Sequence, residues 1–112
     1  MTARLTAEFL VKALIRRVHD AGGSAAVLAR GDATSGAILV IGVDRDATTR
    51  FWERGIGPTG AAAILPAGPL DSAAESHDDY WRRRRQRDPD LWVVELSIAA
   101  AERFVAETML VD

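Results

Sequence analysis

Apolar side chains recur at helical spacing near the start of the chain. One face repeats them at i, i+3, i+4, i+7 and i+8, in the order Ala7, Leu10, Val11, Leu14, Ile15 and Val18. The opposite face is polar, and the pair Gly22-Gly23 follows as a stop of the kind that ends helices. The spacing therefore predicts an amphipathic helix over residues 7–18 that ends before Gly22.

Three short runs after this helix predict β-strands. Residues 24–30 (SAAVLAR) and 37–43 (AILVIGV) flank the turn-forming loop GDATSG, so we expect them to pair as a hairpin. The run 37–43 is apolar on both faces, which is typical of a central strand. Residues 48–54 (TTRFWER) have a more polar pattern, which favours a strand at the edge of the sheet.

A long irregular segment and a helix come next. Residues 55–71 hold three prolines and four glycines and lack a strand or helix period, so we expect a long Gly/Pro loop. Ser72 and Glu75 form a capping box for a helix that runs to about Arg87. Pro89 ends this helix, because the residue before a proline is disfavoured in the helical region.

The last quarter of the chain predicts one strand and one helix. Residues 91–96 (LWVVEL) read as a strand buried on both faces, and Ser97 can cap a final helix. The order is then helix, three-strand antiparallel meander, long Gly/Pro loop, helix, fourth strand and C-terminal helix. Strands in one block, followed by a helix and a strand, indicate a single α+β domain over residues 1–112.

The composition limits the classes of function. Sixteen acidic residues against fourteen basic ones give a net charge of −2, so the chain as a whole does not attract nucleic acid or anionic lipid. Cysteine is absent, which excludes disulfides and thiolate metal sites and suits a reducing cytoplasm. The sequence has no apolar run of export-signal or membrane-spanning type, so we expect a cytoplasmic protein with no membrane partner.

Four segments of the chain match a known pattern. They are VKALIRR in the first helix, AAVLARGD followed by GAILV, the Gly57-Pro58 loop, and RDPDLWVVEL after the arginine-containing helix. Together they resemble the small bacterial proteins of domain-of-unknown-function family 1491, over nearly the whole chain and most specifically over residues 88–95. The resemblance implies a compact α+β unit. Since that family carries no assigned activity, the resemblance contributes no catalytic residues.

Two patterns bear on cofactors and metals. The letters GIGPTG at residues 55–60 match a dinucleotide-binding loop, but Pro66 cuts off any helix that would follow, so a plain loop is the favoured interpretation. His77, Asp78 and Asp79 are consecutive, and consecutive helix positions point about 100° apart, so these side chains do not share one metal ion. We therefore expect neither a cofactor nor a metal.

Five arginines at residues 82–87 are the sharpest functional candidate. Beside Trp81, an exposed arginine face can hold phosphates by bidentate contacts while the indole stacks on a base. The candidate surface for a protein partner or nucleic acid comprises Arg82, Arg83, Arg87, Arg50, Trp52 and Arg54. The alternative is a solvated helix end, in which Asp78 pairs with Arg82, Asp79 pairs with Arg83, and the basic residues complement the helix dipole.

The favoured functional hypothesis is a non-enzymatic protein-interaction or scaffold module that forms a homodimer through a sheet face or edge. Trp92, Val94 and Leu96 are its candidate interface residues, since they would mark a subunit contact if that face of the sheet were uncovered. The second hypothesis is a nucleic-acid-binding protein that uses the helix end at residues 82–87.

The third hypothesis is a small enzyme with an acid–base site built from Asp88, Asp90, Glu95 or His77. The sequence contains no nucleophile elbow, no phosphate-binding P-loop and no zinc-protease motif. This hypothesis therefore requires that the four residues converge in a pocket and that the pKa values of the carboxyl groups are raised there.

Overall fold

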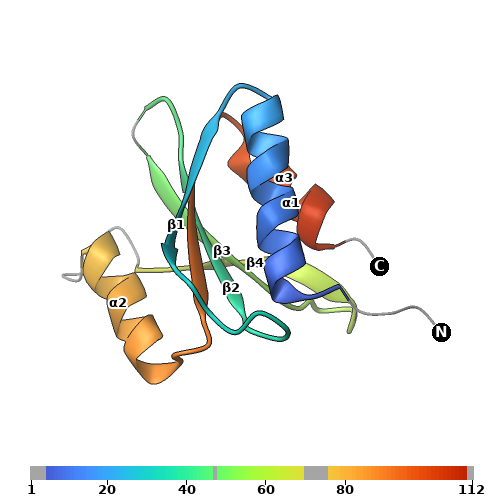
Figure 1. The fold of residues 1–112 in the computed structure, drawn as a ribbon, viewed down its shortest axis with the longest axis vertical. Coiled ribbons are helices and arrows are strands. Elements are labelled where there is room, and N and C mark those ends of the chain that lie inside the picture. Colours follow the sequence, from blue (N-terminus) through green and yellow to red (C-terminus); the bar gives the residue numbers. More distant parts are fainter. Residues whose placement is uncertain (1–4, 47, 70–75, 111–112) are drawn as a thin grey trace.

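The computed structural model describes residues 5–46, 48–69 and 76–110, and Figure 1 shows their arrangement. The elements in chain order are α1 (Ala7–Asp20), β1 (Ser24–Ala29), β2 (Ile38–Val43), β3 (Thr49–Ile56), β4 (Ala62–Ala67), α2 (His77–Arg87), β5 (Trp92–Ser97) and α3 (Ala101–Met109). The strands form one sheet, with α1 and α3 on one face and α2 alone on the other (Figure 1). The expected α+β class is confirmed.

The strand order in the sheet is β1-β5-β2-β3-β4. β5 lies between β1, to which it is antiparallel, and β2, to which it is parallel. The predicted hairpin between residues 24–30 and 37–43 is therefore wrong, because β5 separates the two strands. The physical reason is that β5 is apolar on both faces, which favours an interior position in the sheet, and the place between β1 and β2 provides it.

The segment expected to be a long loop contains a strand. β3 extends to Ile56 and turns through residues 57–61 into β4, which pairs with it antiparallel from Ile56↔Ala62 to Phe51↔Ala67. β3 is consequently an interior strand, and the edge on this side is β4. Pro66 is compatible with this position, because an edge strand has one side whose N–H groups need no ladder partner.

The main core lies between the sheet and the pair α1 and α3. It includes the fully buried side chains of Leu14 and Val18 from α1 and of Val105 from α3. The predicted apolar face of α1 is confirmed, with Ala7, Leu10, Val11, Leu14 and Val18 buried. The helix is capped at its start by Thr6, whose hydroxyl accepts from the N–H of Phe9 at 3.1 Å.

A second, smaller core lies under α2. Tyr80 is the one buried residue of this helix, and its ring meets Phe51 of β3 edge-on with 5.1 Å between the ring centroids. The side chains beneath it are Leu39, Ile41, Phe51 and Val93 of the sheet and Leu91, which precedes β5. Both faces of β2 and β5 are thus covered, as their sequences predict.

Two helices begin differently from the sequence prediction. α2 begins at His77 and is capped by Ser76, whose hydroxyl accepts from the N–H of Asp79 at 3.1 Å, while Ser72 and Glu75 lie outside the described residues. Ser97 does not cap α3, because it is the last residue of β5. The chain instead enters α3 through Ala100, at φ 56°, with no side-chain cap.

Candidate functional site

The five arginines of α2 do not form one free surface, and Arg84 is bound to the sheet. Its Nη1 and Nη2 donate to the two carboxylate oxygens of Glu53 on β3 at 3.3 and 2.8 Å, and Nη1 also donates to the hydroxyl of Tyr80 at 3.0 Å. The hydrogen bonds to Glu53 raise the pKa of Arg84 above its ordinary value. This arginine therefore joins α2 to the sheet.

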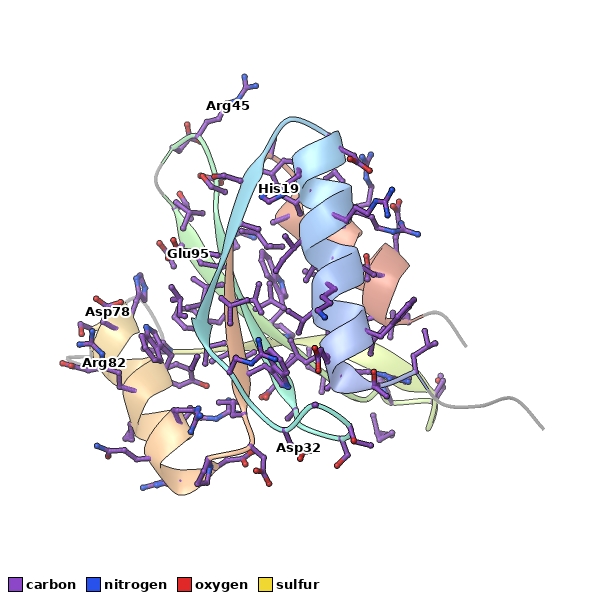
Figure 2. All side chains as sticks on the ribbon, viewed as in Figure 1. His19, Asp32, Arg45, Asp78, Arg82 and Glu95 are labelled. Carbon is purple, nitrogen blue, oxygen red and sulfur yellow. The ribbon has the colours of Figure 1, made fainter. Side chains whose placement is uncertain are left out.

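The other four arginines differ in their contacts. Arg85 donates from Nη2 to the backbone carbonyl of Arg30, just after β1, at 2.6 Å. Arg83 is half-buried and lies over the ring of Tyr80, at 5.4 Å. Arg82 lies over the ring of Trp81, at 5.2 Å, and it is exposed, as is Arg87. Figure 2 shows both Arg82 and Asp78 on α2.

The expected ion pair between Asp78 and Arg82 is absent from the described residues. Asp78 accepts instead from the indole Nε1 of Trp81 at 3.3 Å. The complement to the helix dipole is present, with Asp78 and Asp79 in the first turn and arginines in the last. The solvated-helix interpretation is thus right for the helix dipole and wrong for this pair.

The surface proposed from sequence is divided between the two faces of the sheet. Along β3, Phe51 and Glu53 point toward α2, so Arg50, Trp52 and Arg54 point toward α1 and α3. Trp52 is only 7% exposed and packs in the main core, so it is not free to stack on a base. The structure therefore does not join Arg50, Trp52 and Arg54 to the arginines of α2.

The candidate interface residues on β5 lie inside the molecule. Trp92, Val94 and Leu96 are 0–1% exposed and belong to the main core beneath α1 and α3. The indole Nε1 of Trp92 donates to the backbone carbonyl of Asp32 at 2.8 Å, so its polar atom also has a partner within the chain. These three residues are not open to a second subunit, and the expectation that they form an interface is wrong.

The residues named for acid–base chemistry converge only in part. His77 and Glu95 line one shallow hollow of about 280 Å³ between α2 and the sheet, together with Asp78 and Thr49. Asp88 lies at the other end of α2, where its side chain accepts from the N–H of Asp90 at 3.1 Å. Within the described residues no group of three or more histidine, aspartate and glutamate side chains could hold a metal ion.

Among the described residues, two carboxyl groups have displaced pKa values, and neither belongs to that hollow. The pKa of Glu8 is lowered, first by a hydrogen bond from Lys12 and then by the charges of Lys12 and Arg30. The pKa of Asp32 is lowered chiefly by the backbone N–H of Ser35 at 2.8 Å, with help from the Ser35 hydroxyl and the N–H of Thr34. Both shifts stabilise a carboxylate and give no support to a general acid.

The glycine-rich letters at residues 55–60 belong to the β3–β4 hairpin. The N–H of Gly57 donates to the carbonyl of Ala61 at 2.8 Å, and Gly60 has φ 84°, which closes the turn. An antiparallel strand follows the turn in place of a helix. The favoured interpretation of these letters as a plain loop is therefore right, and the loop is a hairpin turn.

Two surface features are not identified by the sequence reasoning. The first is the free side of β1, where Val27 and Leu28 are 40% and 37% exposed. The second is an apolar groove of about 430 Å³ beside the start of α1, with Leu5, Arg54 and Ile56 at its border. The alternation along β3 places Arg54 and Ile56 on one face, but only the fold brings Leu5 to them.

Comparison with known proteins connects this geometry to a family. The family described as "Protein of unknown function (DUF1491)" matches residues 5–106. The chain belongs to the DUF1491 family. A search among curated proteins found no match. No helix in the described part of this family member is both long and apolar enough to cross a membrane.

Solved structures of DUF1491 proteins share the fold. A crystal structure of a family member from Caulobacter crescentus CB15 has 34% identity, a TM-score of 0.75, and coverage of 90% of this chain and 94% of the other. An NMR structure of a family member from the same organism has 35% identity and a TM-score of 0.75, covering 92% and 94%. The solution structure of protein Atu0922 from A. tumefaciens has 33% identity and a TM-score of 0.65, covering 85% and 86%.

Proposed function

We propose that this DUF1491 protein is a non-enzymatic, cytoplasmic protein-interaction module that acts as a homodimer through the free edge of β1. The main support is that this edge strand is apolar, exposed and, within the described residues, unpaired on its outer side. β1 (SAAVLA) contains no charged residue and no proline, it has no strand partner on its outer side in the described part of the chain, and it exposes Val27 and Leu28. An unprotected apolar edge of this kind favours pairing with another strand.

The opposite edge of the sheet, β4, is less suited to pairing with another strand than β1 is. β4 carries Pro66, which has no N–H to donate to a further strand. A second copy is the natural partner for β1, because an antiparallel strand can pair with itself across a two-fold axis and present the same patch twice. The bulge between Val27 and Ala29 limits regular pairing to the first four residues of the strand.

The test is the mass of the intact protein in solution, measured by light scattering over a range of concentrations. The wild type should have the mass of a dimer, and Val27→Lys should be monomeric because it places a charge on the free edge. Ala62→Lys, a matched change at an exposed position of the other edge strand, should remain dimeric. A wild type that is monomeric at every concentration, or a dimer broken only by Ala62→Lys, would refute the proposed edge.

Nucleic-acid binding is a second candidate, supported by one observation. Arg82 and Arg87 are exposed near Trp81 on the same helix. The surface is smaller than the sequence predicts, since Arg84 and Arg85 are engaged with Glu53 and the backbone of Arg30. The enzyme hypothesis gains no comparable support, because Asp88 and Asp90 lie at the opposite end of α2 from His77 and Glu95.

A further inference from the structure

The apolar groove lies where four segments meet: the start of α1, the loop before β2, the β3–β4 hairpin and the end of α3. Figure 1 shows the start of α1 beside β4. Its interior includes Leu10, Ile38 and Met109, which belong to the main core, and its border includes Leu5 and Ile56, which are 43% and 70% exposed. Exposed apolar side chains that continue into a core are typical of an interaction site.

Arg54 supplies a charge in this apolar setting. Among the described residues that line the groove, it is the one charged side chain. Its guanidinium has no ion-pair partner within the described residues, although the chain as a whole carries a net charge of −2. An unpaired arginine beside apolar side chains is complementary to a carboxylate that is attached to an apolar group.

The helix start beside the groove does not add a second anion-binding element. The first N–H groups of α1 are already used: Ala7 donates to the carbonyl of Thr34 at 3.1 Å, and Glu8 donates to the carbonyl of Ala33 at 2.9 Å. The N–H groups of Phe9 and Leu10 donate to the side chain and the carbonyl of Thr6. Recognition of a negative charge in the groove therefore falls to Arg54.

We propose that the groove binds an acidic, apolar segment of a partner protein, with an apolar side chain seated between Leu5 and Ile56 and a carboxylate paired with Arg54. A protein segment fits better than a small free carboxylate, because the groove is open, whereas small-molecule sites bury most of their ligand. This inference rests on the proposed role as an interaction module, but it uses a surface three strands away from the β1 edge.

The experiment is a selection of random short peptides, displayed on phage, against the full chain, followed by affinity measurements on the enriched peptides. The expected sequences carry Asp or Glu next to a large apolar residue. Arg54→Glu should weaken their binding at least about ten-fold, because it replaces an attractive charge pair by a repulsive one. Ile56→Asp should do the same. Arg50→Glu, which changes another exposed arginine on the same face of β3, should have no effect.

A second selection, against Arg54→Glu, tests whether the charge at position 54 determines which peptides bind. A selection against Arg54→Glu should enrich basic residues where the first selection enriches acidic ones. The proposal is overturned if no peptide is enriched on the wild type, if enriched peptides lack acidic residues, or if they bind Arg54→Glu equally well. It is also overturned if decanoate alone saturates the groove more tightly than the peptides, or if Ile56→Asp dissociates a dimer. If no peptide binds but the protein forms a dimer that Val27→Lys breaks, only the proposed groove ligand is refuted. If the protein is monomeric but binds the peptides, only the proposed dimer is refuted.

Discussion

Arg84 of α2 and Glu53 of β3 form a two-pronged ion pair, with the Nη2–Oε2 and Nη1–Oε1 distances at 2.8 and 3.3 Å. The two residues are 31 positions apart in sequence. Tyr80 is the only buried residue of α2, so the helix has little apolar attachment to the sheet. The ion pair, the Tyr80–Phe51 ring contact and the bond from Arg85 to the backbone of Arg30 together hold the helix in place.

Arg84→Gln should lower the free energy of unfolding by about 1–2 kcal/mol, since a bidentate bond between charged, half-buried groups is stronger than an exposed ion pair. Urea unfolding measures this change. Arg82→Gln, on the same helix but exposed, is the control and should cost much less. If both changes have the same effect, or if Glu53→Gln is fully additive with Arg84→Gln, the pair does not stabilise the attachment of α2.

The Asp32 carboxylate should make stability depend on acid pH. Its pKa is lowered in the folded protein by the N–H and hydroxyl groups of Ser35 and by the N–H of Thr34, so its contribution is complete above its unfolded pKa of about 3.9 and is lost as the pH falls through the folded value. Asp32→Asn keeps the shape but cannot ionise. The melting temperature of the wild type should therefore exceed that of Asp32→Asn near neutral pH.

The difference in melting temperature should close as the pH is lowered below about 4. Asp46→Asn is the matched control, because Asp46 is an exposed turn residue whose side chain accepts no hydrogen bond within the described residues. A difference that stays constant down to pH of about 2.5 would show that the bonds of Asp32 do not depend on its charge.

The elements with a strong apolar period are predictable from sequence, whereas their pairing is not. α1, β2 and β5 follow directly from their patterns of apolar positions. β4 is missed because Pro66 and the neighbouring glycines indicate a loop, and only pairing with β3 makes it a strand. The hairpin prediction fails because turn residues indicate only that the chain reverses locally. The insertion of β5 between β1 and β2 depends on contacts between residues far apart in the sequence.

Gly42→Ala should destabilise the main core. A Cβ at this position would collide with the Trp52 ring and lie 3.0 Å from the Cβ of Ala101 on α3. Overpacking of this kind costs roughly 1–3 kcal/mol, which denaturant unfolding detects. The cost should be smaller in a Trp52→Phe background, where the ring that blocks the position is reduced. An equal cost in both backgrounds would mean that the clash with Trp52 is not the cause.

The nucleic-acid alternative has its own expected outcome. We expect no binding of single-stranded DNA or RNA at about 50 mM salt in fluorescence polarisation, since the chain is acidic and the arginines of α2 are divided between internal contacts and solvent. Salt-sensitive binding that Arg82→Glu with Arg87→Glu abolishes, and that Arg50→Glu with Arg54→Glu leaves intact, would replace the interaction-module proposal by the alternative.

For the candidate sites as well, the sequence shows which residue types are present but not which residues they contact in the fold. The arginine run is evident in the sequence, but nothing local identifies Arg84 as its anchored member, because Glu53 lies on a distant strand. Trp92 looks like an interface anchor until α1 and α3 cover its face of the sheet. The groove at Arg54 cannot be recognised from the sequence, because the two apolar residues on its border, Leu5 and Ile56, are far apart along the chain.

The interior position of β5 also shapes how this protein is made. β5 ends at Ser97, so a ribosome must synthesise most of the chain before the strand that joins β1 to β2 exists. Until then, β1 and β2 lack the neighbour that covers their facing edges, and their apolar residues are open to other molecules. Pairing over such sequence distances is slow, and such nascent chains are prone to aggregate. The emerging polypeptide should therefore be a substrate for chaperones at the exit tunnel, and a synthetic peptide of residues 91–112 should complement a fragment of residues 1–90 in trans.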